Sequence, residues 1–189
     1  MSDPDDAPFR VLAVCTANIC RSPAAELLLR RAFAVAGVAA DVTSAGGAGF
    51  NAAPIDAQTA QALAEMGVEA GDFRSRALDT REVDAADLVL TATVEHRRVV
   101  LTRAPRALRK TFTLKEFAAL AGEGSGARSS VEVVAAALAA RGSRELDVLD
   151  IEDPYRRGLA QQRRAVAEIE RCAHEIASAL GSARGGLLT

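Results

Sequence analysis

The sequence FRVLAVCTANICRSP, residues 9–23, joins a strand pattern to a helix start through a short polar loop. Residues 9–14 form an apolar run with a single charge, which is typical of a strand buried in a parallel sheet. Ser22 can cap a helix and Pro23 suits the first helical position, so we expect the helix to start there. The loop therefore lies at the carboxyl end of a strand and the amino end of a helix.

The loop between these elements, residues 16–21 and called the anion loop below, has the properties of an anion site. Its backbone N–H groups can turn inward, and the dipole of the following helix adds positive potential. Arg21 adds a planar, permanently charged fork that can hold two phosphate oxygens. We therefore expect phosphate to be bound by Arg21 together with its neighbours Thr16, Ala17, Asn18, Ile19, Cys20 and Ser22.

Cys15 directly precedes the anion loop, and this position favours its thiolate. Inward N–H dipoles, a helix N-terminus and a nearby arginine all stabilise an ionised cysteine. A thiolate at the floor of a phosphate site can attack phosphorus in line and form a phosphocysteine intermediate. Ser22 can then donate a hydrogen bond to the sulfur and ease its departure, whereas Asn18 is expected to stiffen the loop.

The anion loop, taken with Asp153-Pro154-Tyr155 near the other end of the chain, resembles the low-molecular-weight protein tyrosine phosphatase family. The two motifs have the family's order and separation, and the resemblance runs from about residue 9 to the last helix. Ser44-Ala45-Gly46 and Phe73-Arg74-Ser75-Arg76 also resemble parts of the family pattern. The resemblance implies a cysteine-dependent phosphomonoester hydrolase without cofactor or metal, acting on a phosphotyrosine protein or an aryl phosphate.

The same resemblance implies that Asp153 is the general acid and base. A phenolate that leaves phosphorus needs a proton, which a carboxylic acid opposite the anion loop can supply. Pro154 restricts the residue before it to extended geometry, and Tyr155 offers an aromatic wall for the ring of a phosphotyrosine. Like-charge repulsion should help to keep one carboxyl protonated, because the loop also holds Asp147, Asp150 and Glu152.

Two positions depart from the family pattern. Ala17 stands where glycine is frequent, so its backbone must avoid the positive φ that glycine adopts freely. Phe73 stands where many members have histidine, so a hydrogen bond that would hold Asn18 is expected to be lost or replaced. The rigidity of the anion loop depends on both positions.

The remaining cysteines and histidines allow several interpretations. Cys20 is either a small apolar filler or a resolving thiol that forms a disulfide with Cys15 under oxidation. Cys172 lies beside an apolar stripe of the last helix and is expected to be buried and structural. His96 and His174 have no metal-ligand spacing, so no metal site is expected, and His96 is interpreted as a helix cap or a surface residue.

Two other functions are compatible with part of the pattern. Arsenate reduction on the same fold needs a relay of cysteines, for which Cys20 is too near to Cys15 and Cys172 too buried. An inactive phosphopeptide-binding module would not need a nucleophile, an arginine and an acid together, so the combination of Cys15, Arg21 and Asp153 argues against it.

Composition and charge argue against several other classes of protein. The 189 residues, of which 49% are hydrophobic and 4% aromatic, suffice for one well-buried domain. A net charge of −2, with arginines scattered along the chain, gives no basic surface for nucleic acid. No apolar run is long enough to cross a membrane, and the N-terminus does not resemble a leader. A cytoplasmic location is therefore expected, with non-classical export and the oligomeric state left open.

The order of strand and helix patterns predicts an α/β fold: a single-domain parallel four-stranded sheet with helices on both faces, and the phosphatase loop between the first strand and the first helix. Strands are expected at 9–15, 41–45, 86–92 and 110–114, and helices at 23–36, 55–66, 95–101 and 115–121. The domain should span 9–181, between flexible tails at 1–8 and 182–189. Residues 122–145 resemble an insertion, with a flexible linker at 122–130 and a helix at 131–140, that is either solvated or covers one side of the cleft.

Overall fold

The computed structural model describes residues 8–48, 51–124, 126–143, 146 and 148–185. The strands are β1 (Phe9–Cys15), β2 (Ala40–Gly46), β3 (Leu88–Thr91) and β4 (Thr111–Thr113). The α-helices are α1 (Arg21–Val35), α2 (Ala57–Ala64), α3 (Thr80–Ala85), α4 (Val94–Arg103), α5 (Leu114–Ala121), α6 (Ser130–Ala140) and α7 (Leu159–Gly185), and short 3-10 helices lie at η2 (Pro105–Lys110) and η3 (Gly122–Gly124).

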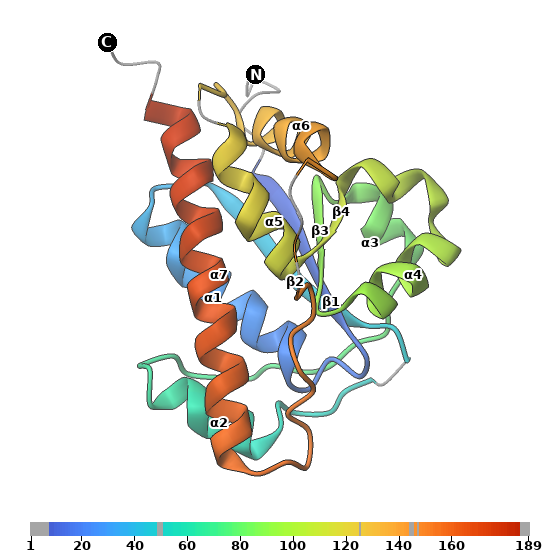
Figure 1. Cartoon of the computed structure of the whole chain (residues 1–189). Coiled ribbons are helices and arrows are strands. Elements are labelled where there is room, and N and C mark those ends of the chain that lie inside the picture. The colour runs from blue at the N-terminus through green and yellow to red at the C-terminus, as the bar shows by residue number, and fades with distance from the viewer. Residues whose placement is uncertain (1–7, 49–50, 125, 144–145, 147, 186–189) are drawn as a thin grey trace, which may run out of the picture.

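The strands form one parallel sheet in the order β2-β1-β3-β4 (Figure 1). The chain leaves β1 toward β2 on one side and later returns to β3 on the other, so the strand order reverses at β1. In such sheets ligands bind outside the carboxyl ends of the strands at the point of reversal. Cys15, the last residue of β1, lies at this point, and the predicted fold class is confirmed.

Alternation along β1 places helices on both faces of the sheet. Val11 and Ala13 belong to the larger core, which includes residues of α1, α5 and α7. Leu12 and Val14 belong to a second core on the other face, with residues of α3 and α4. Because successive side chains of a strand point to opposite faces, one apolar strand anchors both layers.

The start of α1 differs from the prediction. The helix begins at Arg21, its N-cap is Cys20, and no side chain caps it. The expectation that Ser22 caps this helix is therefore wrong, because Ser22 lies inside the first turn and its hydroxyl has other partners. Pro23 still lies in the first turn, where its missing N–H costs no helical hydrogen bond.

Helix α6, which lies within the segment 122–145, packs into the core and is not solvated on all sides. Residues 122–124 form η3, not a flexible linker. Helix α6 buries Val133, Val134 and Ala137 completely or almost completely. Figure 1 places α6 at the end of the sheet opposite the β1–α1 connection, so this helix does not cover the cleft.

Helix α7 continues to Gly185, past residue 181, where the domain was expected to end and a flexible tail to begin. Ala183 of this helix is buried against the larger core, so residues 182–185 do not form a flexible tail. Residues 1–7 and 186–189 of the expected tails lie outside the described residues. Within the described part of the chain, no helix combines the length and apolar character that a membrane span requires.

Candidate active site

The anion loop connects β1 to α1 in a tight path that depends on two backbone positions. Asn18 adopts a positive φ of 57°, a region that asparagine tolerates better than most residues. Ala17 does not adopt a positive φ, so the loop avoids the conformation that alanine disfavours. Gly46 lies directly against the loop, where a Cβ atom would come within 2.9 Å of backbone atoms of Thr16 and Ala17.

The buried side chain of Asn18 holds the loop from inside. Its Nδ2 donates to Ser22 Oγ at 2.9 Å and to Ser44 Oγ at 2.8 Å, and its Oδ1 accepts from the backbone N–H of Arg76 at 2.9 Å. Phe73 packs against the core instead of reaching Asn18. The hydrogen bond that Phe73 cannot supply is therefore replaced by contacts from Ser44 and Arg76.

A buried carboxylate supports this arrangement from the side of α1. Ser44 Oγ donates to Glu26 Oε2 at 2.5 Å, and Glu26 forms an ion pair with Arg30 at 2.7 Å. The Glu26 side chain is only 8% exposed, so it relies on these partners to compensate its desolvation. This role of Glu26 could not be predicted from the sequence, because its position is that of an ordinary residue in an amphipathic helix.

Cys15 is buried, and its sulfur lies 3.0 Å from Ser22 Oγ. Asn18 donates to the Ser22 oxygen, and the Ser22 hydroxyl proton has two acceptors in reach, the sulfur of Cys15 and the carbonyl of Ala45 at 3.4 Å. This contact explains why Ser22 does not cap α1. The contact predicted between Ser22 and Cys15 is present.

Arg21 and Asp153 are brought together from opposite ends of the chain. Arg21 is buried, and its Nη1 donates to the carbonyl of Ile151 at 3.3 Å. Its Nη2 lies 3.2 Å from Asp153 Oδ2, and the Asp153 side chain is 56% exposed. The arginine fork is thus fixed by the backbone, while the carboxylate stands at an open position beside it.

The other acids of this loop have their own partners. Asp150 Oδ1 accepts from the backbone N–H of Val94 at 2.8 Å, and Glu152 forms an ion pair with Arg157. Asp147 lies outside the described residues. These contacts give no support to the expectation that Asp150 and Glu152 act on the protonation of a neighbour by like-charge repulsion.

Tyr155 follows Asp153 in the same loop and is 41% exposed. Its backbone N–H donates to Asp153 Oδ1 at 3.3 Å, which orients the carboxylate relative to the ring. The guanidinium of Arg156 lies 5.1 Å from the centre of the Tyr155 ring, a cation–π distance. The loop thus holds the Asp153 carboxylate through the backbone of Tyr155 and leaves part of Tyr155 exposed.

His96 belongs to the site, although the sequence suggested a cap or a surface residue. Its Nε2 lies 2.8 Å from Thr16 Oγ1 in the anion loop, and its Nδ1 lies 2.7 Å from Thr93 Oγ1. Burial, and next the positive charge of Arg21, lowers the pKa of His96 to about 4. The sequence indicates this place only weakly, because the one pointer is the position of His96 shortly after β3, near the carboxyl edge of the sheet.

Cys20 and Cys172 are free and buried. Burial raises the pKa of each thiol to about 11. Both interpretations of Cys20, a filler and a resolving thiol for Cys15, are compatible with this arrangement. The described residues contain no group of three or more histidines, cysteines or acids that could hold a metal ion.

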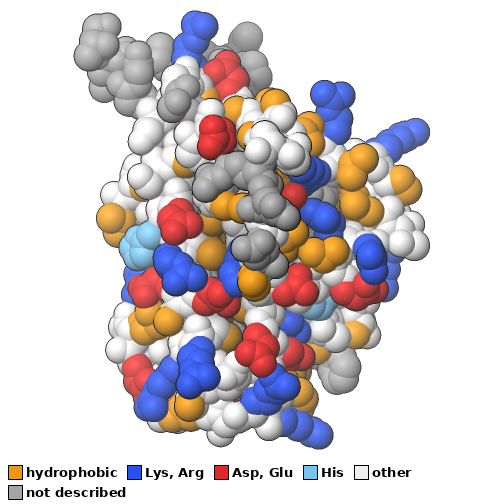
Figure 2. All heavy atoms as spheres, viewed as in Figure 1, with side chains coloured by type: hydrophobic (Ala, Val, Ile, Leu, Met, Phe, Trp, Pro, Cys, Tyr) orange, Lys and Arg blue, Asp and Glu red, His pale blue; other side chains and the backbone are white. Residues whose placement is uncertain are grey.

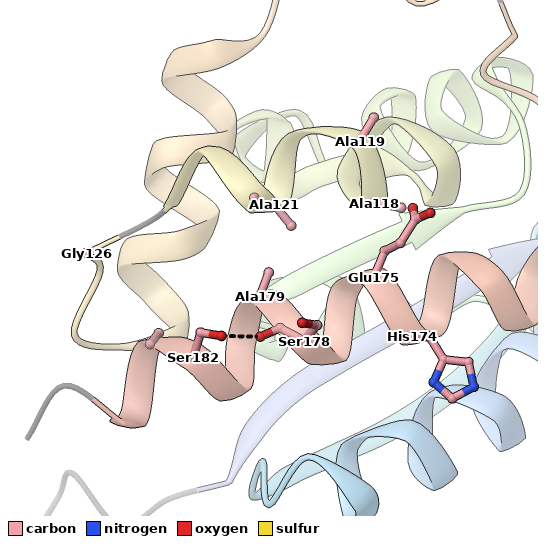
Figure 3. Close-up of a pocket in the computed structure, with 11 residues that line it drawn as sticks. Ala118, Ala119, Ala121, Gly126, His174, Glu175, Ser178, Ala179 and Ser182 are labelled. Carbon is pink, nitrogen blue, oxygen red and sulfur yellow. Dashed lines mark hydrogen bonds between the residues drawn. The ribbon is translucent and has the colours of Figure 1, made fainter. Parts of the chain in front are cut away.

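A hollow of about 610 Å³ lies away from the anion loop, between α5 and α7. Figure 3 shows Glu175 reaching toward Ala118 of α5, whereas His174 points away from that helix. None of the residues that line the hollow belongs to the anion loop. Figure 2 shows positive and negative side chains interspersed over one face of the molecule, without a large area of a single sign.

Comparison with known proteins agrees with this geometry. The family model described as low molecular weight phosphotyrosine protein phosphatase matches residues 10–127. The chain is 30% identical over 170 residues to the low molecular weight protein-tyrosine-phosphatase Etp of Escherichia coli K12, covering 90% of this chain and 93% of Etp. It is 40% identical over 110 residues to a protein-arginine-phosphatase of Geobacillus stearothermophilus, covering 58% and 72% of the two chains.

A solved structure gives the same result. The YwlE arginine phosphatase from Geobacillus stearothermophilus superposes with a TM-score of 0.74 and 29% identity, covering 96% of this chain and 99% of that one. The match therefore includes the carboxyl-terminal part that lies beyond the family model. This chain belongs to the low molecular weight phosphotyrosine protein phosphatase family.

Proposed function

We propose that this phosphatase hydrolyses phosphotyrosine in proteins through a phosphocysteine on Cys15. The observation that carries the proposal is the convergence of Cys15, Ser22, Arg21 and Asp153 at the carboxyl end of β1. A nucleophile, a phosphate-binding fork and an acid are the groups that this reaction needs.

In the first step, the thiolate of Cys15 attacks phosphorus, the S–P bond forms and the P–O bond to tyrosine breaks. Arg21 and the amides of the anion loop stabilise the charge on the phosphoryl oxygens, a task that metal ions perform in other phosphoryl-transfer enzymes. Asp153 donates its proton to the departing phenolate. When phosphate occupies the fork of Arg21, the ion pair between Arg21 and Asp153 gives way to the substrate.

In the second step, water attacks phosphorus and the S–P bond breaks, which releases phosphate and restores the thiolate. Asp153, now ionised, accepts the proton of the attacking water. Ser22 donates a hydrogen bond to the sulfur as negative charge returns to it. Asn18 fixes the Ser22 oxygen, and therefore acts on the reaction through Ser22.

The preference for an aryl substrate rests on Tyr155. This half-exposed residue follows Asp153 in the same loop, and its backbone N–H contacts the Asp153 carboxylate. A substrate ring can stack on Tyr155 while the acid reaches the phenolic oxygen. Ring stacking contributes about 0.5–1.5 kcal/mol beyond the burial of area, which is enough to favour aryl over alkyl phosphates.

Phosphoarginine is a second candidate substrate, because the chain is 40% identical over 110 residues to a protein-arginine-phosphatase. The carboxylate of Asp153 would then face a guanidinium instead of a phenol. Arsenate reduction has less support, since Cys20 and Cys172 are buried and burial raises their pKa to about 11.

The test compares a phosphotyrosine peptide and a phosphoarginine peptide of the same sequence with the wild-type enzyme. We expect the larger kcat/KM for phosphotyrosine, no activity after Cys15→Ser, and a loss of about 10²–10⁴ in kcat after Asp153→Asn, the usual contribution of a general acid. A larger kcat/KM for phosphoarginine would contradict the tyrosine assignment. An unchanged kcat in Asp153→Asn would mean that another residue is the general acid.

A further inference from the structure

His96 connects the start of helix α4 to the anion loop, and the proposed reaction assigns it no role. Thr93 is the N-cap of α4, and its Oγ1 accepts the backbone N–H of His96 at 3.2 Å. The imidazole then bridges Thr93 to Thr16 in the anion loop, with one ring nitrogen on each hydroxyl. Thr16 is exposed at the mouth of the site, and Arg21 Nη2 lies 3.5 Å from its Oγ1.

Two tautomers of a neutral His96 satisfy these contacts, because each threonine oxygen can accept two hydrogen bonds. In one of them, the hydroxyl of Thr93 donates to Nδ1, and Nε2 carries the ring proton and donates it to Thr16 Oγ1. In this tautomer, Thr16 Oγ1 accepts hydrogen bonds from His96 and from Arg21.

In this tautomer, the hydroxyl proton of Thr16 has no acceptor among the contacts of the described residues. Thr16 is the first residue of the anion loop, and Nη2 of Arg21 lies 3.5 Å from its oxygen. A phosphoryl group bound by Arg21 can therefore accept this proton, and a donor held at that place stabilises the charge of a transition state. The role of Thr16 proposed below depends on this tautomer.

The surroundings of His96 keep the ring neutral, as this arrangement requires. Burial and the charge of Arg21 disfavour the imidazolium, and the carboxylates of Asp153, Asp150 and Glu95 oppose them more weakly. The net effect lowers the pKa of His96 to about 4. The ring therefore has one donor and one acceptor throughout the neutral and mildly acidic range.

We propose that His96 is a positioning residue of the active site, which holds the hydroxyl of Thr16 as an additional hydrogen-bond donor to the phosphoryl oxygens. The inference rests on the proposed phosphatase function and adds two residues to it. Thr16 acts on the phosphate, and His96 acts only through Thr16.

The test measures kcat and KM with an aryl phosphate for Thr16→Val, Thr16→Ser, His96→Ala, His96→Gln and the double variant His96→Ala/Thr16→Val. We expect Thr16→Val to lower kcat/KM roughly 10-fold to 100-fold, as for a hydrogen bond to a charged group. Thr16→Ser keeps the hydroxyl and should retain most activity. His96→Ala should lose a part of the same effect, and His96→Gln, whose amide can donate in place of Nε2, should recover it.

The double variant separates positioning from a structural role. If His96 acts through Thr16, His96→Ala costs little once Thr16 is valine, so the two effects are not additive. Additive losses, or a loss in His96→Ala that His96→Gln does not recover, would overturn the inference. His174→Ala is the matched control, since His174 is the other histidine and its side chain is 60% exposed on α7.

Binding of inorganic phosphate to the Cys15→Ser protein, measured by calorimetry, distinguishes failure of this inference from failure of the proposed function. We expect adding Thr16→Val or His96→Ala to Cys15→Ser to weaken phosphate binding. Unchanged binding and unchanged turnover in these variants would overturn the role of His96 while an active wild-type enzyme preserves the phosphatase. A wild-type protein without hydrolase activity would overturn the function, and the phosphate affinities would still decide the inference.

Discussion

The hydroxyl side chains of Ser22 and Thr93 have different roles, one in contact with the nucleophile and one at the start of a helix. Ser22 was expected to cap a helix, yet its oxygen accepts from Asn18 and lies 3.0 Å from the sulfur of Cys15. Thr93 does cap its helix, and in addition contacts the ring of His96. A hydroxyl side chain therefore contributes to the fold at one position and to the site at another, according to the partners that the tertiary structure supplies.

The lowered pKa of His96 predicts a dependence of stability on pH. The unfolded ring titrates near 6.5 and the folded ring at about 4, so the unfolded state binds more protons between these values. The contribution of His96 to the free energy of unfolding is therefore fully present above pH 6.5 and is lost as the pH falls to 4. It should amount to about 1–2 kcal/mol, reduced for the partial exposure of the ring.

Denaturant unfolding of the wild type and of His96→Gln at several pH values measures this contribution. The stability of the wild type should fall more steeply than that of the variant between pH 6.5 and 4, while His174→Gln, at an exposed position, should follow the wild type. Parallel curves for the wild type and His96→Gln would show that the ring titrates normally in the folded protein.

At the scale of elements, the anion loop and the end of β2 depend on each other. Gly46 closes β2 and leaves no room for a Cβ atom next to the backbone of Thr16 and Ala17. Gly46→Ala should displace the loop and lower kcat by about tenfold or more, since a small displacement of reacting groups is costly. Gly122→Ala, where a Cβ atom meets nothing within 4 Å, is the matched control, and equal activity of the two variants would contradict the close packing.

Substitutions in helix α6 should lower stability without lowering activity, because this helix packs at the end of the sheet that is remote from the site. Val133 is fully buried on this helix, and Val131 is 62% exposed two residues earlier. Val133→Ala should lower the free energy of unfolding by about 2 kcal/mol, while Val131→Ala should change it little. Both variants should keep the wild-type kcat, and a drop in kcat for Val133→Ala under folding conditions would mean that α6 contributes to the cleft.

For the whole molecule, the sequence predicted the parts that depend on local patterns. The apolar run of β1, the loop that follows it and the succession of strands and helices were sufficient for a parallel sheet with its site at the carboxyl edge. Because Gly122 and its neighbours resemble a linker, the sequence predicts a segment that is either solvated or covers the cleft, and only the tertiary structure shows Val133 of α6 in the core. The place of His96 in the site could not be predicted either, because its contact with Thr16 joins residues that are far apart in the chain.

The central claim is that Cys15 carries the phosphoryl group between substrate and water. Rapid mixing of the wild-type enzyme with a phosphotyrosine peptide, followed by acid quench and mass analysis of the protein, measures this directly. We expect one phosphoryl group on Cys15 during turnover of the wild type and none on residue 15 of Cys15→Ser. Hydrolysis without a phosphoprotein, or with phosphate on another residue, would contradict it.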